Sequence, residues 1–69
     1  MSNKTNYTYY SQYLINYLRD TDNPLANDAE FIEARAELAA EEFDSNRLCG
    51  MEAFQAQEFA MEVLMAGFD

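Results

Sequence analysis

The sequence predicts an all-α fold, a compact three-helix bundle with helices at about residues 8–19, 28–48 and 52–66. Three segments carry apolar residues at intervals of three and four positions, the spacing that places side chains on one side of a helix. Strand signals are weak, because no run of β-branched residues alternates with polar ones. A chain of 69 residues allows one domain. We therefore expect residues 1–69 to form a single helical domain, with a disordered start at about residues 1–6.

The first expected helix carries one continuous apolar stripe. Its members are spaced i, i+3, i+4, i+7 and i+8, and they are Tyr10, Tyr13, Leu14, Tyr17 and Leu18. Tyrosine is only a middling helix former, so tertiary packing has to hold this helix. Tyrosines can also stack on nucleic-acid bases, but the acidic surroundings disfavour that role. We expect the stripe to face the core, and the helix to end before Pro24.

The second expected helix begins near Asn27 or Asp28, where Asn27 and Glu30 have the spacing of a capping box. Its core face is expected to consist of Ile32, Ala36, Ala39, Ala40 and Phe43, and to be widened by Phe31, Ala34 and Leu38. The sequence allows two C-terminal ends for this helix. In the first, Asn46 caps an early end. In the second, the helix continues to Leu48 or Cys49, and Gly50 adopts the left-handed conformation. Arg47 suits the negative end of the helix dipole, so the longer helix is favoured.

The third expected helix is apolar on more than one side. One face is expected to enter the core, and it consists of Ala56, Phe59, Ala60, Val63, Leu64 and Gly67. A second apolar strip consists of Phe54, Met61, Met65 and Phe68. The other two helices can cover only part of so apolar a helix. We therefore expect this strip to be an interaction surface for a protein partner or a weak homodimer, although a dimer brings two chains of net charge −9 together.

The composition argues against catalysis and against metal binding. The chain has no His, no Trp and one Cys, and it has four basic residues against thirteen carboxylates. Acid–base catalysis by carboxylates needs two with separated pKa values in a pocket, for which a chain of this size hardly has room. Asp20 and Asp22 are spaced like the start of a calcium loop, but Leu25 replaces the required glycine and Phe31 the bidentate glutamate. We expect a non-enzymatic protein without metal or cofactor.

The net charge of −9 also limits the class of partner. It repels phosphate backbones and anionic lipids, so we expect no direct binding to nucleic acid or membrane. No segment reaches the 18–20 apolar residues, roughly, of a membrane span, and the polar N-terminus lacks the apolar core of a signal peptide. We expect a cytoplasmic helical protein-interaction module. The alternative is an acidic decoy that inhibits a nucleic-acid-binding enzyme by occupying its basic groove.

Three stretches, Tyr13–Arg19, Pro24–Ala26 and Glu30–Ala36, resemble a small uncharacterised family of Bacteroides-type bacteria. Its members are often carried by conjugative transposons and related mobile elements. The likeness covers roughly Tyr9 to Phe68, and its most specific part is Phe31–Ala36, followed by Ala39-Ala40 and Gly50. The resemblance implies a mostly helical fold and brings no known activity and no catalytic residues.

Members of this family tend to continue past the third helix with a further helical segment. The resemblance therefore implies that the chain is either a short member or a fragment. In a fragment, the missing segment would cover the strip of Phe54, Met61, Met65 and Phe68.

Overall fold

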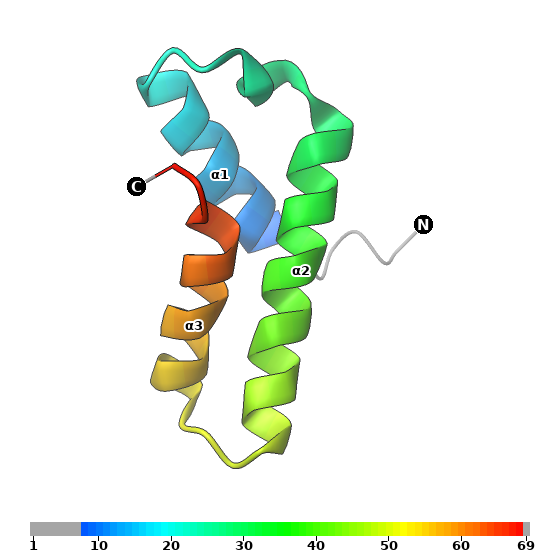
Figure 1. Ribbon diagram of the computed structural model, residues 1–69, viewed down its shortest axis with the longest axis vertical. Coiled ribbons are helices and arrows are strands. Elements are labelled where there is room, and N and C mark those ends of the chain that lie inside the picture. Colours follow the sequence, from blue (N-terminus) through cyan, green and yellow to red (C-terminus); the bar gives the residue numbers. More distant parts are fainter. Residues whose placement is uncertain (1–7, 69) are drawn as a thin grey trace.

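The computed structural model describes residues 8–68, and within them it has three α-helices, one short 3-10 helix and no strand (Figure 1). The elements are α1 (Thr8–Asp20), η2 (Pro24–Asn27), α2 (Ala29–Leu48) and α3 (Ala53–Met65). The predicted all-α three-helix bundle is confirmed, and each helix begins and ends within one residue of its predicted bounds. The disordered start predicted at residues 1–6 lies outside the described residues.

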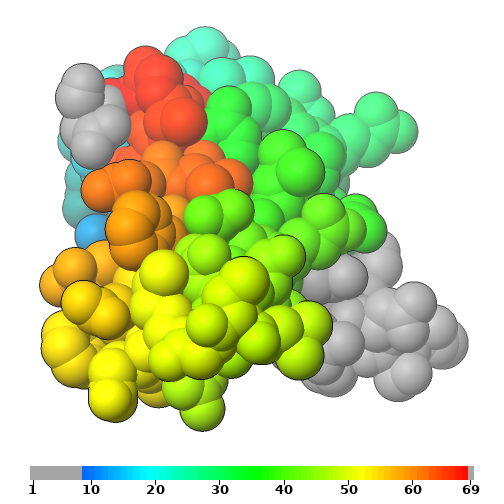
Figure 2. Space-filling model, turned by 60° about the horizontal axis from the view of Figure 1, so that its bottom comes forward, coloured from blue at the N-terminus to red at the C-terminus, as the bar shows by residue number. Residues whose placement is uncertain are grey.

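α2 is the helix on which the other two pack. α2 and α3 run antiparallel side by side and are joined by a short connection, while α1 crosses behind their upper half (Figure 1). α1 contacts α2 far more extensively than it contacts α3. Figure 2 brings the α2–α3 connection forward, and from this end α1 lies largely behind the other helices. The weak contact between α1 and α3 is what leaves an opening between them.

The start of α2 differs in detail from the predicted capping box. Asp28 is the N-cap, and its Oδ1 accepts a hydrogen bond from the backbone N–H of Phe31 at 3.1 Å. Asn27 is the last residue of η2, which Pro24 begins and Asn23 caps by accepting from the N–H of Leu25 at 2.9 Å. The predicted pairing of Asn27 with Glu30 is therefore wrong. The proline-initiated turn continues to Asn27, so the capping position moves one residue along the chain.

The C-terminal end of α2 follows the longer of the two predicted alternatives. Gly50 has a φ of +93°. Its N–H donates to the carbonyl oxygen of Arg47 at 2.9 Å, and the N–H of Met51 donates to that of Asn46 at 3.0 Å. These two bonds form a Schellman motif, which satisfies carbonyl groups that have no partner inside the helix. Glycine at this position therefore lets the chain turn back toward α3.

Gly50→Ala is expected to lower the free energy of unfolding by about 1 kcal/mol, because the left-handed conformation is unfavourable for a residue with a Cβ. A Cβ at this position would meet nothing within 4 Å, so the loss comes from the backbone alone. Urea denaturation followed by circular dichroism measures it. Gly50→Asn is the matched control and should lose less, since asparagine tolerates this conformation. Equal losses in the two variants would contradict the explanation.

The core lies where the three helices meet. Leu14 and Leu18 of α1 and Leu64 of α3 are the largest fully buried side chains. The rest of the buried set consists of four fully buried alanines and three larger residues that are slightly exposed, namely Ala36, Ala39, Ala56, Ala60, Tyr10, Ile32 and Met65. The predicted core face of α2 is confirmed, since Ala40 and Phe43 pack against this cluster. Its predicted widening is wrong at Ala34 and Leu38, which are exposed because no helix among residues 8–68 covers that side of α2. Alanines on α2 and α3 allow their backbones to approach closely.

Three residues predicted for the core faces of α1 and α3 lie at the surface, namely Tyr13, Phe59 and Gly67. The side chain of Phe59 is 43% exposed and that of Tyr13 is 44% exposed. The buried face of α3 follows Ala56, Ala60 and Leu64, which are spaced four apart, and Phe59 lies about 100° from Ala60 around the helix. The assignment of Phe59 to the core is therefore wrong. Tyr13 lies at the edge of its stripe, on the side where α1 separates from α3.

Within residues 8–68, no helix combines the length and the apolar character needed to cross a membrane.

Candidate interaction surface

The four residues predicted to form an interaction surface do not share one exposed strip. Phe54 is 67% exposed, whereas Met65 is buried, Met61 is half-buried and Phe68 packs against the core. The C-terminal half of α3 lies beside α1, while its first turn extends past the start of α1 (Figure 1). The first turn is thus left uncovered and the rest is largely covered. The expectation of a bare strip is wrong, although Met61 and Met65 both line a different surface described below.

Phe68 belongs to the folded structure. The Tyr17 hydroxyl donates to the Phe68 carbonyl oxygen at 2.8 Å. The Phe68 ring lies 6.1 Å from the ring of Tyr17 and 5.9 Å from that of Phe31, edge to face in the second case. These contacts join α1, α2 and the segment after α3, so Phe68 is unavailable to a partner without local unfolding.

Arg35 fastens the C-terminal end of α3 to α2. Its Nη1 donates to the carbonyl oxygen of Ala66 at 2.8 Å, and it lies 3.2 Å and 3.4 Å from those of Leu64 and Val63. Carbonyl groups at a helix C-terminus lack partners within the helix, and the negative end of the dipole favours a cation. The guanidinium carbon also lies 5.1 Å from the ring centroid of Phe31. The sequence offers no local signal for this role, because donor and acceptors are 28–31 residues apart.

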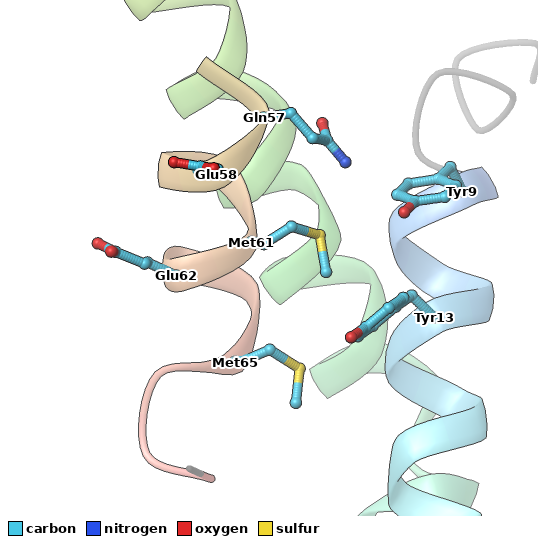
Figure 3. A pocket seen from close by; sticks show the side chains of 7 residues that line it. All are labelled: Tyr9, Tyr13, Gln57, Glu58, Met61, Glu62 and Met65. Atoms are coloured by element: carbon cyan, nitrogen blue, oxygen red, sulfur yellow. The ribbon is translucent and has the colours of Figure 1, made fainter. Parts of the chain in front are cut away.

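α1 and α3 diverge around an open hollow of about 410 Å³. We call it the α1–α3 groove, and it is lined by Tyr9, Tyr13, Gln57, Glu58, Met61, Glu62 and Met65. Figure 3 shows Gln57, Met61 and Met65 pointing from α3 toward the two tyrosines of α1. Glu58 and Glu62 point to the outer side of α3. The groove thus has an aromatic wall, a thioether wall and a carboxylate rim.

Tyr10 ties the two sides of the groove together beneath its surface. The side chain is buried, and its hydroxyl donates to Oε1 of Gln57 at 2.8 Å. Tyr9 lies edge to face against Tyr10, with 5.4 Å between the ring centroids. Burial raises the pKa of the Tyr10 phenol, and the neighbouring Tyr9 and Asp44 raise it further. Tyr10 is therefore a structural support for the groove in its neutral form.

A family model described as "Domain of unknown function (DUF1896)" matches residues 2–69. The chain belongs to this family. No curated protein and no solved structure matches it. Membership of DUF1896 agrees with the resemblance to an uncharacterised family, and it assigns no activity to any residue. The role of this DUF1896 chain has to be argued from its own geometry.

Tyr10→Phe should make the DUF1896 chain less stable at neutral pH and less sensitive to alkali. Losing the hydrogen bond to Gln57 should lower the free energy of unfolding by about 1 kcal/mol. The folded-state pKa of Tyr10 lies above the ordinary value of 10.0, so folding favours the neutral phenol. That contribution is fully present below pH 10 and is lost as the pH rises through the raised pKa.

The measurement is urea denaturation of wild type and variant between pH 7 and pH 11. The wild type should lose more stability above pH 10 than Tyr10→Phe does. Tyr13→Phe, whose phenol is exposed, is the control and should follow the wild type. Parallel curves for wild type and Tyr10→Phe would contradict the assignment.

Most of the described side chains that line the groove are uncharged. Its walls consist of tyrosine rings and methionine thioethers, and its two carboxylates are exposed to solvent. In residues 8–68, no group of three or more His, Cys, Asp or Glu is placed to hold a metal ion. The sequence reasoning found Met61 and Met65 but missed Tyr9, Tyr13 and Gln57. The available signal was the four-residue spacing of Tyr9, Tyr13 and Tyr17, which places all three on one side of α1.

Proposed function

We propose that this chain is a non-enzymatic protein–protein interaction module that binds its partner through the α1–α3 groove. The observation that carries the proposal is the open hollow with Tyr9 and Tyr13 on one side and Met61 and Met65 on the other. Tyr9 is 58% exposed, so the folded chain leaves a large aromatic side chain uncovered at this place. Methionine adapts its shape to varied partners, and tyrosine contributes much contact area with few torsions to fix.

Other exposed apolar side chains support the proposal less directly. Leu38, Leu48, Phe54 and Phe59 are uncovered, but none of them lines the groove. Single apolar side chains on a surface are common and need no partner to explain them. A concave surface with several convergent apolar groups is a stronger indication of a binding site. The scattered residues therefore serve as controls.

The acidic decoy is the second candidate, and a feature of α2 favours it. Glu30, Glu37 and Glu41 are all exposed. They extend over residues 30–41 of one helix, which is a rise of about 16 Å. A row of carboxylates of this length resembles a stretch of phosphates to a basic protein surface. This candidate predicts binding that depends on charge and not on the groove.

Affinity isolation from the source cell at about 0.1 M and about 1 M sodium chloride separates the two candidates, because screening at high salt removes most attraction between exposed charges. Bait proteins are the wild type, Tyr13→Ala/Met61→Ala, and the control Leu38→Ala/Leu48→Ala. The module predicts a partner that is retained at high salt, lost with the groove variant and kept with the control. A partner that is lost at high salt and indifferent to the groove variant would favour the decoy. Failure to retain a partner in either buffer would contradict both.

A homodimer is tested separately by sedimentation equilibrium. Met65 is buried, so changing it to glutamate would perturb the fold as well as the surface. Tyr13→Ala/Met61→Ala is therefore the better variant for this purpose. A wild-type dimer that this variant dissociates would identify a second copy as the partner.

We also propose that the chain acts in the cytoplasm and is linked to a mobile element. The exposed thiol of Cys49 is compatible with a reducing compartment. The link to a mobile element is supported by the resemblance over Phe31–Ala36. Transfer or excision genes beside the coding sequence would bear it out, and a neighbourhood of unrelated housekeeping genes in several strains would contradict it.

A further inference from the structure

We infer that the occupant of the α1–α3 groove is an amphipathic helix with basic residues beside its apolar face. This inference rests on the proposed function and specifies the partner's chemistry. Three properties of the groove support it. Its walls are helices whose backbone groups bond to one another, a second hollow continues it along α1, and the charged side chains around it are acidic.

The backbone on both sides of the groove is already hydrogen-bonded. Tyr13 lies in the second turn of α1 and Met61 lies within α3, where main-chain groups bond to one another along the helix. Tyr9 lies in the first turn of α1, whose N–H groups have no acceptor inside the helix, but they point along the helix axis and form no row along the groove. An extended peptide would find no free row of N–H and C=O groups to pair with, as it would at a sheet edge. A partner segment that loses water here has to form the hydrogen bonds of its N–H and C=O groups within itself. A helix meets this requirement, because its backbone groups bond to one another.

A second hollow on α1 continues the groove along that helix. Tyr13 also lines a second hollow of about 270 Å³, together with Asn16, Tyr17 and Asp20. The two hollows therefore adjoin along α1, which has 13 residues and a length of about 20 Å. A partner helix of three to four turns matches this length, and its i, i+3, i+4 and i+7 side chains would enter between the tyrosines and the methionines.

The charged side chains among the described residues that line the two hollows are all acidic. Glu58 and Glu62 line the first hollow and Asp20 lines the second, and all three are exposed. Among the described residues that line either hollow, none is basic. Glu58 and Glu62 point to the outer side of α3, so long lysine or arginine side chains at the edge of the partner helix would reach them across α3. The tyrosine rings also attract cations. A second copy of this chain, with its net charge of −9, fits the rim poorly.

The test uses two synthetic helical peptides of 14 residues. They share one leucine-rich face and differ in their polar face, which is lysine-rich in one and glutamate-rich in the other. Binding of each labelled peptide is measured by fluorescence anisotropy at about 0.15 M sodium chloride. The lysine peptide should bind at least about tenfold more tightly than the glutamate peptide. Tyr13→Ala/Met61→Ala should weaken its binding at least about tenfold, as expected where central anchors are truncated.

A matched pair of charge variants locates the attraction. Glu58→Gln/Glu62→Gln and Glu37→Gln/Glu41→Gln remove the same two charges, the first from the rim of the groove and the second from the exposed side of α2. The rim variant should weaken binding of the lysine peptide about fivefold, and the α2 variant less than about twofold. All four side chains are exposed, so the fold should persist, and thermal unfolding by circular dichroism checks that it does.

Each other result overturns the inference. Equal weakening by the two charge variants would assign the attraction to the charge of the whole molecule. If both peptides bind with equal affinity and the groove variant weakens both, the partner helix does not need lysine or arginine, and the proposed function still stands. Absence of binding by either peptide would reject an amphipathic helix as occupant, while the affinity isolation still decides the proposed function. Groove-dependent self-association would replace the partner helix with a second copy.

Discussion

Leu64→Ala is expected to lower the free energy of unfolding by about 3–4 kcal/mol. Leu64 is fully buried within the core cluster formed by all three helices, so truncation leaves a cavity as well as losing buried apolar surface. A domain of this length has a total stability of about 3–10 kcal/mol. The variant should be only marginally folded at room temperature. Urea denaturation followed by far-ultraviolet circular dichroism measures the change.

Phe59→Ala is the matched control on the same helix. It removes a larger apolar side chain, but Phe59 is 43% exposed and lies outside the core cluster. We expect it to lower the free energy of unfolding by about 1 kcal/mol or less. The apolar spacing of α3 places both side chains in the core and so predicts a large loss for each variant. A larger loss for Phe59→Ala than for Leu64→Ala would show that α3 packs with a different face inward.

Arg35→Met is expected to lower the free energy of unfolding by about 2 kcal/mol. Methionine keeps an apolar stem of similar length and loses the guanidinium that bonds to the carbonyl oxygens of Ala66 and Leu64. A hydrogen bond from a charged donor contributes about 1.5–3 kcal/mol, and the rings of Phe31 and Phe68 lose a cation as well. Thermal and urea denaturation give the size of the loss.

Arg19→Met controls for the change in net charge. Arg19 lies in the last turn of α1 and is exposed, so its loss should amount to about 0.5 kcal/mol or less. Amide hydrogen exchange adds a local readout, since Arg35→Met should speed exchange chiefly in the last turn of α3. Equal effects of the two substitutions would mean that Arg35 acts only through its charge.

The helix boundaries were predictable because they depend on neighbouring residues. α1 ends at Asp20, where Asp22 has a φ of +56° and the N–H groups of Asp22 and Asn23 donate to carbonyl oxygens of its last turn, within the Asp- and Asn-rich segment before Pro24. Gly50 reaches a φ of +93° that the Schellman motif needs. The N-cap was misplaced by one residue because both Asn27 and Asp28 suit that position. The choice between them depends on how far the turn started by Pro24 continues, which a local pattern does not reveal.

The buried face of α3 was harder to predict because apolar residues occur around most of this helix. Periodicity then places Phe59 and Leu64 on one broad face and does not show that only Leu64 is buried. Close packing against α2 decides the matter, since Ala56 and Ala60 let the two helices approach where a phenylalanine would hold them apart. The α1–α3 groove was missed for a related reason. It arises from the divergence of two helices. Of the residues that line it, only Met61 and Met65 belong to the interaction surface that the sequence predicts.

The unequal packing of α1 on its two neighbours has a thermodynamic consequence. α2 and α3 adjoin in sequence and in space, whereas α1 is held mainly by α2 and meets α3 sparsely. Detachment of α1 is therefore the sub-global opening that disrupts the least packing, and it removes one wall of the groove. A ligand that bridges both walls binds only the closed form. Its binding and the docking of α1 are then linked equilibria, so that a saturating ligand raises the free energy of this opening by RT ln(1 + [L]/Kd).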